Sequence, residues 1–189
     1  NVHWEHAIPA YKNAPHVWNV GGQDNVCVFL IDTGDGLILI DTGLNAETCY
    51  LVIDRIWQSG HDPRDIKKIL LTHWHNDHTC NARVLHELTG AEIWLSREDE
   101  IEHKKHENMV GSIDLVDGKP VMSWIDADSE EAKLAGKHAD YPYEVTNFYD
   151  DDKPIVLGNF TIRTKLCPGH TPGVTSFFFE DTDEETGKT

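Results

Sequence analysis

Four side chains that can bind a metal ion lie within six residues of one another: His73, His75, Asp77 and His78. One residue separates His73 from His75, so in locally extended backbone both imidazoles point the same way. That spacing places two nitrogen ligands on one ion. Asp77 and His78 follow directly, and they offer a carboxylate and an imidazole to a second position nearby.

A fifth candidate ligand, His170, lies in the segment Cys167–Gly173. The glycines and proline around it set a tight backbone that can present the ring inward. With His73 and His75 it makes a set of three histidines, which is typical of a catalytic zinc site with one open position. Zinc lowers the pKa of a bound water to about 7 and so supplies hydroxide at neutral pH, and no Ser or Cys nucleophile is then required.

The elements around these segments predict a layered α/β fold, because strand-like and helix-like runs alternate. Strands are predicted over Val26–Ile31, Leu37–Ile40, Ile66–Leu71, Ala91–Leu95, Pro154–Leu157, Phe160–Leu166 and Val174–Phe179. Helical spacing predicts an apolar stripe on one helix, formed by Cys49, Val52, Ile53, Ile56 and Trp57, and a second helix with Val84, Leu85 and Leu88 that Gly90 ends. Both ligand segments therefore follow the end of a strand.

The sequence outside the ligand segments is less specific. The segment 104–143 predicts only short helices, in an insertion beside the core of a single domain spanning residues 1–189. His103 and His106, separated by lysines, are interpreted as solvated surface, and Cys27 as a buried small side chain. Trp74 either borders the site or packs behind the loop.

Composition excludes some partners. Acidic residues outnumber basic ones 33 to 16, for a formal charge of −17, which repels nucleic acid and anionic membranes. No stretch has the length and apolar character of a membrane span. We therefore expect a small-molecule substrate.

These segments resemble the metallo-β-lactamase superfamily. Thr72–His78 matches its HxHxDH signature, Pro168–Gly173 resembles its second ligand motif, and Ile40–Gly43 resembles an upstream element. The resemblance implies an αβ/βα sandwich with the metals at the rim between two sheets. Because the strand Val174–Phe179 has no following partner, we expect the C-terminal part of that fold to be missing from this chain.

The resemblance also implies roles for the site residues. His73, His75 and His170 would hold the first zinc, and Asp77 and His78 would contribute to a second. Asp41 resembles an acid that steadies the metal loop by hydrogen bonds; the alternative is an aspartate that caps a turn. The family usually completes the second metal with a later histidine, and no histidine follows His170 in this chain.

Within the superfamily the resemblance is closest to subclass B3, on Val20-Gly21-Gly22, the HxHxDH segment and Gly169–Gly173. It implies a zinc-dependent hydrolase that opens a β-lactam ring, with Asp77 orienting the nucleophilic hydroxide. A lactonase or a glyoxalase-II-like thioesterase with the same ligands is an alternative, as is an iron-binding redox protein of this fold. A true β-lactamase would be periplasmic or secreted, and the sequence leaves the compartment open.

Overall fold

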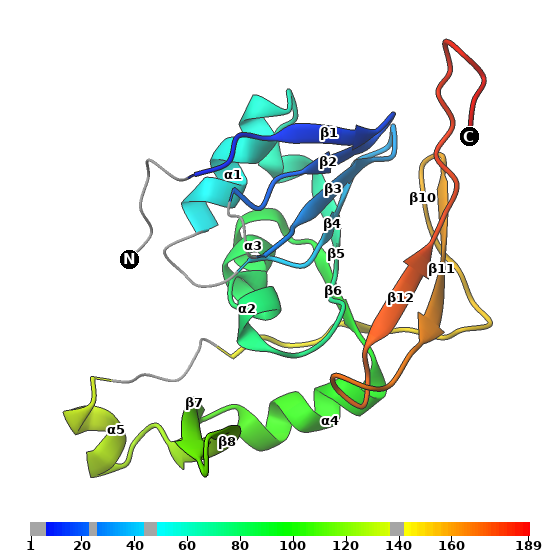
Figure 1. Cartoon of the computed structure of the whole chain (residues 1–189). Helices are drawn as coiled ribbons and strands as arrows, with labels where there is room; N and C mark the ends of the chain where they lie inside the picture. The colour runs from blue at the N-terminus through cyan, green and yellow to red at the C-terminus, as the bar shows by residue number, and fades with distance from the viewer. Residues whose placement is uncertain (1–6, 23–25, 44–48, 137–141) are drawn as a thin grey trace.

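A mixed sheet forms the centre of the computed structural model, which describes residues 7–22, 26–43, 49–136 and 142–189 (Figure 1). In order across the sheet, its seven strands are β1 (Tyr11–Ala14), β2 (Val17–Asn19), β3 (Phe29–Asp32), β4 (Leu37–Ile40), β5 (Ile66–Leu70), β6 (Glu92–Leu95) and β9 (Asn147–Phe148). Neighbours from β1 to β4 are antiparallel, and those from β4 to β9 are parallel. The parallel half needs crossovers, and the helices α1 (Cys49–Gln58) and α3 (Ala82–Thr89) supply two of them.

Strand β4 shows why the sheet is covered on both faces. All four of its residues are buried, and successive side chains of a strand point to opposite faces. Leu37 and Leu39 enter one apolar core, together with Val52 and Ile56 of α1. The intervening isoleucines enter a second core, together with Phe160. The central strand therefore needs a helical layer on one side and another layer on the other.

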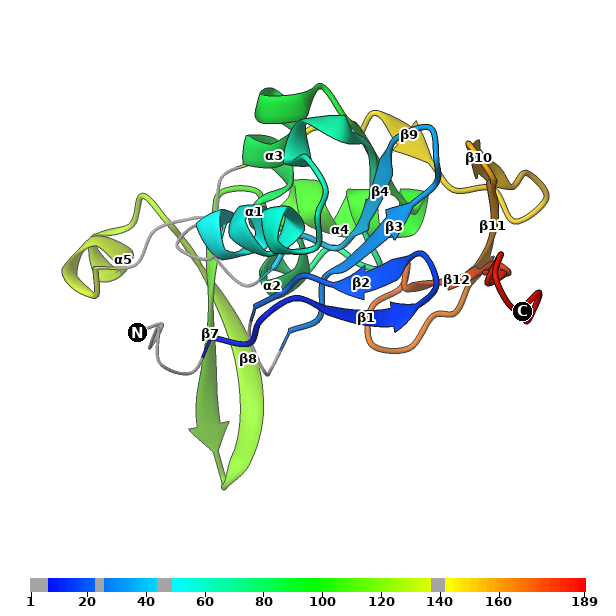
Figure 2. The same ribbon diagram turned by 90° about the horizontal axis from the view of Figure 1, so that it is seen from above.

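That other layer is a three-stranded antiparallel sheet made of β10 (Ile155–Leu157), β11 (Phe160–Leu166) and β12 (Thr175–Phe178). Figures 1 and 2 show it packed across the central sheet from α1 and α3. The turn between β10 and β11 also contacts the β3–β4 turn, where the Asn159 amide donates to the Thr33 carbonyl at 2.9 Å. The layered α/β sandwich expected from the sequence is confirmed.

The segment 104–143 was predicted to hold only short helices, and this was wrong. After α4 (Arg97–His106) the chain forms a hairpin of β7 (Met109–Val116) and β8 (Lys119–Asp126), followed by α5 (Glu130–Leu134). The turn is Asp117-Gly118, in which both residues have positive φ (52° and 74°). An Asp-Gly pair is the preferred sequence for such a two-residue hairpin turn, and this signal was overlooked.

Two side-chain placements also differ from the prediction. Trp57, assigned to the apolar stripe of α1, is 53% exposed. The buried face of this helix includes Leu51 in its place. Cys27 is exposed although it lies in an apolar run. Its neighbours Val26 and Val28 are buried, so in extended backbone the residue between them points the opposite way. No helix in the described ranges is long and apolar enough to cross a membrane.

Gly158→Ala is expected to destabilise the protein more than Gly60→Ala. Both glycines have positive φ (+50° and +89°), so alanine costs about 1–2 kcal/mol of backbone strain at each position. A Cβ at Gly158 would also lie 2.1 Å from the Thr33 carbonyl oxygen, whereas a Cβ at Gly60 meets nothing within 4 Å. Urea unfolding of both variants measures the difference. Equal losses would contradict a tight contact between the two turns.

Candidate metal centre

Two loops from different sheets form the site. The first leaves β5 at Leu71 and enters the short helix α2 (Asn76–Thr79), with His75 as its N-cap residue in extended backbone. The second joins β11 to β12 and carries His170. A backbone hydrogen bond of 2.9 Å from the Thr175 amide to the Thr72 carbonyl holds the two loops side by side.

Three of the predicted ligands, His73, His75 and His170, come together across these loops. One ring nitrogen of each lies within 4.8 Å of those of the other two. The Nδ1 atom of His75 is 3.0 Å from the Nε2 atom of His170. These residues are 95 positions apart in the chain, so only the packing of the two sheets brings them into contact.

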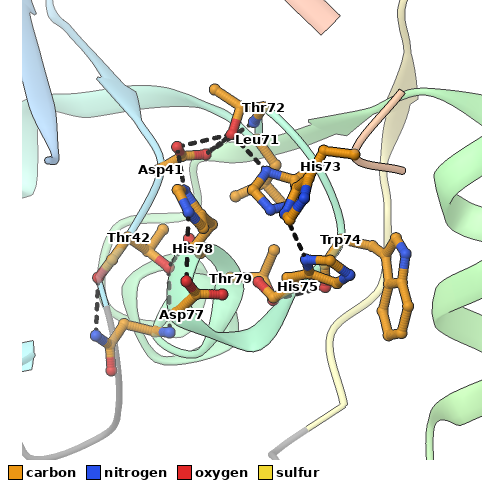
Figure 3. Close-up of polar contacts among 12 residues, drawn as sticks. Asp41, Thr42, Leu71, Thr72, His73, Trp74, His75, Asp77, His78 and Thr79 are labelled. Carbon is orange, nitrogen blue, oxygen red and sulfur yellow. Dashed lines mark hydrogen bonds and ion pairs between the residues drawn. The ribbon is translucent and has the colours of Figure 1, made fainter. Parts of the chain in front are cut away.

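The other predicted ligands lie on the opposite side of His73. Asp77, His78 and His73 form a second group whose ligand atoms are also within 4.8 Å of one another. The Asp77 Oδ2 atom is 3.6 Å from the His78 Nε2 atom. Figure 3 shows Asp77 below the His78 ring, at the start of α2. His73 therefore belongs to both groups.

The donor set fits a metal ion. The Nε2 atom of His73 is buried and has no hydrogen-bond partner within the described part of the chain, which is uncommon for a buried polar atom. Two nitrogens bound to one tetrahedral zinc lie about 3.3 Å apart, given Zn–N distances of about 2.0–2.1 Å. The 3.0 Å between His75 and His170 is close to that spacing. Imidazole and carboxylate ligands without thiolate suit zinc and other divalent transition metals.

Asp41 lies next to Thr72 and the His78 ring (Figure 3). Its Oδ1 atom accepts a hydrogen bond from the Thr72 amide at 2.8 Å, and its Oδ2 atom lies 2.7 Å from the His78 Nδ1 atom. The Thr72 hydroxyl donates to Asp41 at 2.8 Å and is 3.0 Å from the His73 Nδ1 atom. Because the single O–H of Thr72 donates its hydrogen bond to Asp41, the hydroxyl oxygen accepts a hydrogen bond from the Nδ1–H of His73. This tautomer leaves the Nε2 lone pair of His73 free for a cation.

The rings differ in how readily they take a proton. Burial and the neighbouring imidazoles lower the pKa of His73 from 6.5 to about 3. Burial and His170 lower the pKa of His75 as well. Burial also acts against protonation of His78, but the hydrogen bond and charge of Asp41 outweigh it and raise the pKa of that ring. At neutral pH His73 is thus a free nitrogen base, which metal binding requires.

A residue that the sequence analysis missed, Asp99, connects the two loops. It lies in the first turn of α4 and is fully buried. One carboxylate oxygen accepts from the Trp74 amide at 3.1 Å and from the Thr171 hydroxyl at 2.7 Å. The other oxygen accepts from the Gly173 amide at 2.7 Å. The Ser96–Asp99 spacing is a helix-start pattern that could have been noticed, but it predicts a cap and not a bridge between loops.

The interpretation of His103 and His106 as solvated surface was wrong for His103 and incomplete for His106. His103 is 8% exposed, and its ring stacks on Tyr143 with centroids 4.1 Å apart. The His106 ring stacks on Trp74, with centroids 4.9 Å apart and planes inclined by 15°. Side chains of α4 therefore contact two other parts of the protein: His106 contacts the hairpin, and His103 contacts the segment at Tyr143.

The fold and the site together define the class of protein. The family model of the metallo-β-lactamase superfamily matches residues 21–183, which is most of the chain. The chain belongs to this superfamily, as the resemblance in the sequence implied. Two of the three segments that carried the resemblance, Thr72–His78 and Pro168–Gly173, lie on the two loops described above, which are hydrogen-bonded to each other through Thr175 and Thr72 and carry the ligand groups.

Solved structures narrow the comparison. The chain is similar to BJP-1, a subclass B3 metallo-β-lactamase of Bradyrhizobium japonicum, with a TM-score of 0.73 and 25% identity over 96% of this chain and 60% of that one. It is similar to the metallo-β-lactamase GOB-18 from Elizabethkingia meningoseptica, with a TM-score of 0.75 and 28% identity over 98% of this chain and 61% of that one. The chain thus spans about 60% of the length of these structures.

We expect the metal-free protein to lose stability as the pH falls from 6.5 towards 3. In that interval an unfolded His73 takes up a proton, while the buried ring, with its pKa of about 3, stays neutral. This one group contributes a slope of at most about 1.4 kcal/mol per pH unit. Urea unfolding with chelator at several pH values measures the slope, and His73→Gln should reduce it. An unchanged slope in the variant would contradict the assignment.

Asp99→Asn is expected to weaken metal binding about tenfold, because one of the three donors then faces an amide N–H and the loops separate. Glu98→Gln is the matched control: it removes the same charge from the same helix turn, but Glu98 is exposed. Competition with a chromophoric chelator gives the affinity, and the visible spectrum of the cobalt-loaded protein reports ligand geometry. Identical spectra and affinities for both variants would show that the Asp99 bridge does not position the metal ligands.

Proposed function

We propose that this protein is a zinc-dependent hydrolase that opens β-lactam rings, with His73, His75 and His170 holding one ion and Asp77 and His78 contributing to a second. The observation that carries the proposal is the buried Nε2 atom of His73, which has no hydrogen-bond partner among the described residues, on the histidine that belongs to both ligand groups. Superfamily membership and the similarity to solved β-lactamases support the reaction class.

The site is open to a small molecule. His73 is buried, whereas His75 is half-buried and His170 is exposed, so the ligand set closes on the protein side and opens towards solvent. The pocket next to them has a volume of about 460 Å³, within the range of about 300–1,000 Å³ that is usual for small-molecule sites.

When bound, zinc would polarise the lactam carbonyl and make a water molecule acidic at neutral pH. Asp77 lines the pocket beside His75, and its carboxylate can accept the proton of the attacking water and hold it. The same carboxyl group can then deliver the proton to the lactam nitrogen when the C–N bond breaks. Asp41 fixes the His78 ring in place through Nδ1, which leaves Nε2 on the side of Asp77.

Two other functions are compatible with the same ligand set. A lactonase or a thioesterase of the glyoxalase-II kind attacks an acyl carbon with the same groups, so the substrate and not the metal separates them. An iron-binding redox protein would contain iron after purification without added metal and would consume oxygen.

The full-length protein is expected to hydrolyse penicillins or carbapenems, and to lose this activity with chelator and regain it with zinc. His170→Ala should lower bound zinc and reduce kcat at least a hundredfold, because one ligand of the first ion is removed. Asp77→Asn should reduce kcat by about 10²–10⁴-fold with little loss of stability, because proton transfer is impaired. The measurements are steady-state kinetics, metal content and thermal unfolding.

His86→Gln is the matched control, because His86 lies on α3, outside the site, and its ring is hydrogen-bonded to the Ala91 carbonyl. Full activity of His170→Ala would overturn the metal assignment. Turnover of homoserine lactones or S-lactoylglutathione without β-lactam hydrolysis would replace the β-lactam substrate by an ester or thioester.

A further inference from the structure

The peptide group that joins Leu71 to Thr72 is held at both of its polar ends. Its N–H, on Thr72, donates to the Asp41 Oδ1 atom at 2.8 Å (Figure 3). Its C=O, on Leu71, lies 3.0 Å from the Tyr149 hydroxyl, which comes from a segment 78 positions further along the chain. His73 follows Thr72 directly. The orientation of this peptide plane therefore determines how the chain enters the metal loop.

The Tyr149 hydroxyl lies near two carbonyl oxygens, that of Leu71 at 3.0 Å and that of Trp94 at 2.9 Å. A phenol has only one proton to donate. The Trp94 carbonyl already accepts a hydrogen bond from the Leu71 amide at 3.0 Å, whereas the phenol is the donor that reaches the Leu71 carbonyl among the described residues. Leu71 is fully buried, so the phenolic proton is needed at its carbonyl.

The end of strand β5 explains why a side chain supplies this donor. The parallel ladder between β5 and β6 ends at the pair Leu70–Trp94, so the Leu71 carbonyl lies beyond it. The next carbonyl along the chain, that of Thr72, accepts from the Thr175 amide of the second loop at 2.9 Å. The first backbone groups of the metal loop therefore take their partners from different parts of the fold.

The Tyr149 ring is fixed in place and remains a donor. It stacks on Trp94, with centroids 6.2 Å apart and planes inclined by 21°, and it meets the Phe177 ring edge-on at 5.5 Å. Trp94 belongs to β6 and Phe177 to β12, so strands of both sheets hold the ring. Burial raises the pKa of Tyr149 well above its usual value, and the charge of Asp41 raises it further. The hydroxyl therefore keeps its proton at neutral pH.

We propose that Tyr149 is a positioning residue for His73: its hydroxyl and the Asp41 carboxylate together hold the Leu71–Thr72 peptide plane, and this plane sets the direction of the His73 side chain. The C=O and N–H of one peptide group are coplanar, so a carbonyl that loses the hydroxyl and rotates turns the Thr72 N–H away from Asp41. Asp41 also holds His78, at 2.7 Å. This inference rests on the proposed function only in placing a metal ion at these histidines, and it is independent of the substrate.

The first test needs no metal. In the metal-free full-length protein, Tyr149→Phe keeps the ring beside Trp94 and Phe177 and removes only the hydroxyl. The Thr72 amide should exchange with deuterium about two- to tenfold faster than in the wild type, the factor that one neutral hydrogen bond supplies. Amides of the β3–β4 pair should exchange as before. Hydrogen exchange followed by NMR measures each amide.

Tyr11→Phe is the control, because it removes the same hydroxyl from a tyrosine that is 45% exposed on β1. It should leave the exchange of the Thr72 amide at the wild-type rate. Thermal unfolding shows whether both variants are folded. Equal acceleration at all amides of Tyr149→Phe, or none at Thr72, would overturn the proposal, since the hydroxyl would then add only to overall stability.

Cobalt binding then tests the consequence for the metal centre. Tyr149→Phe should bind Co²⁺ about tenfold more weakly than the wild type and shift its visible absorption bands, because groups that orient a ligand affect both affinity and geometry. Tyr11→Phe should match the wild type in both measurements. An unchanged affinity and spectrum in Tyr149→Phe would overturn the positioning role. If the wild type binds no cobalt but Thr72 exchange still depends on the Tyr149 hydroxyl, the proposed function fails and the placement of His73 by Tyr149 stands.

Discussion

The constraint around which this structure is arranged is a buried imidazole nitrogen, the Nε2 atom of His73, that has no partner in the part of the chain that the structure describes. Leaving such an atom unsatisfied costs about 1–3 kcal/mol, so the fold must hold His73 there against a penalty. The Thr72 hydroxyl and the Asp41 carboxylate hold the other side of the ring in one tautomer. A cation bound at the His73 Nε2 atom would remove this penalty. A buried imidazole at this position would then be compatible with a stable protein.

The packing of the two sheets determines how the ligand histidines lie relative to one another. His73 and His75 follow a strand of the central sheet, while His170 lies between two strands of the smaller sheet, so their separation depends on how the sheets pack. The isoleucines of β4 and Phe160 set that packing through a shared apolar core. At the rim, the buried Asp99 carboxylate accepts hydrogen bonds from both loops and fixes their distance more finely than apolar contact does.

The two ends of the pocket have different origins. The ligand end is built from strand-to-loop junctions of the sandwich, which carry the sequence motifs of the superfamily. The other, aromatic end, lined by His106 and Trp124, is built from α4 and a hairpin whose conformation depends on local turn chemistry at Asp117-Gly118 and on Trp124 covering Gly111. The ligand end and the aromatic end therefore depend on different parts of the sequence, as is usual where loops surround a rigid scaffold.

The sequence alone was sufficient to predict the layered fold, most of the strands and the superfamily. The alternation of strand-like with helix-like runs and the spacing of His73, His75 and Asp77 are local properties of the chain. It also pointed to His170 through its glycine- and proline-rich surroundings, although the distance to His75 could not be known. The hairpin was missed even though its Asp-Gly turn was visible. The bridge at Asp99 and the packing of the Trp74, His106 and Trp124 rings against one another were decided only by the tertiary structure, because contacts between residues far apart in the chain leave no periodic pattern in the sequence.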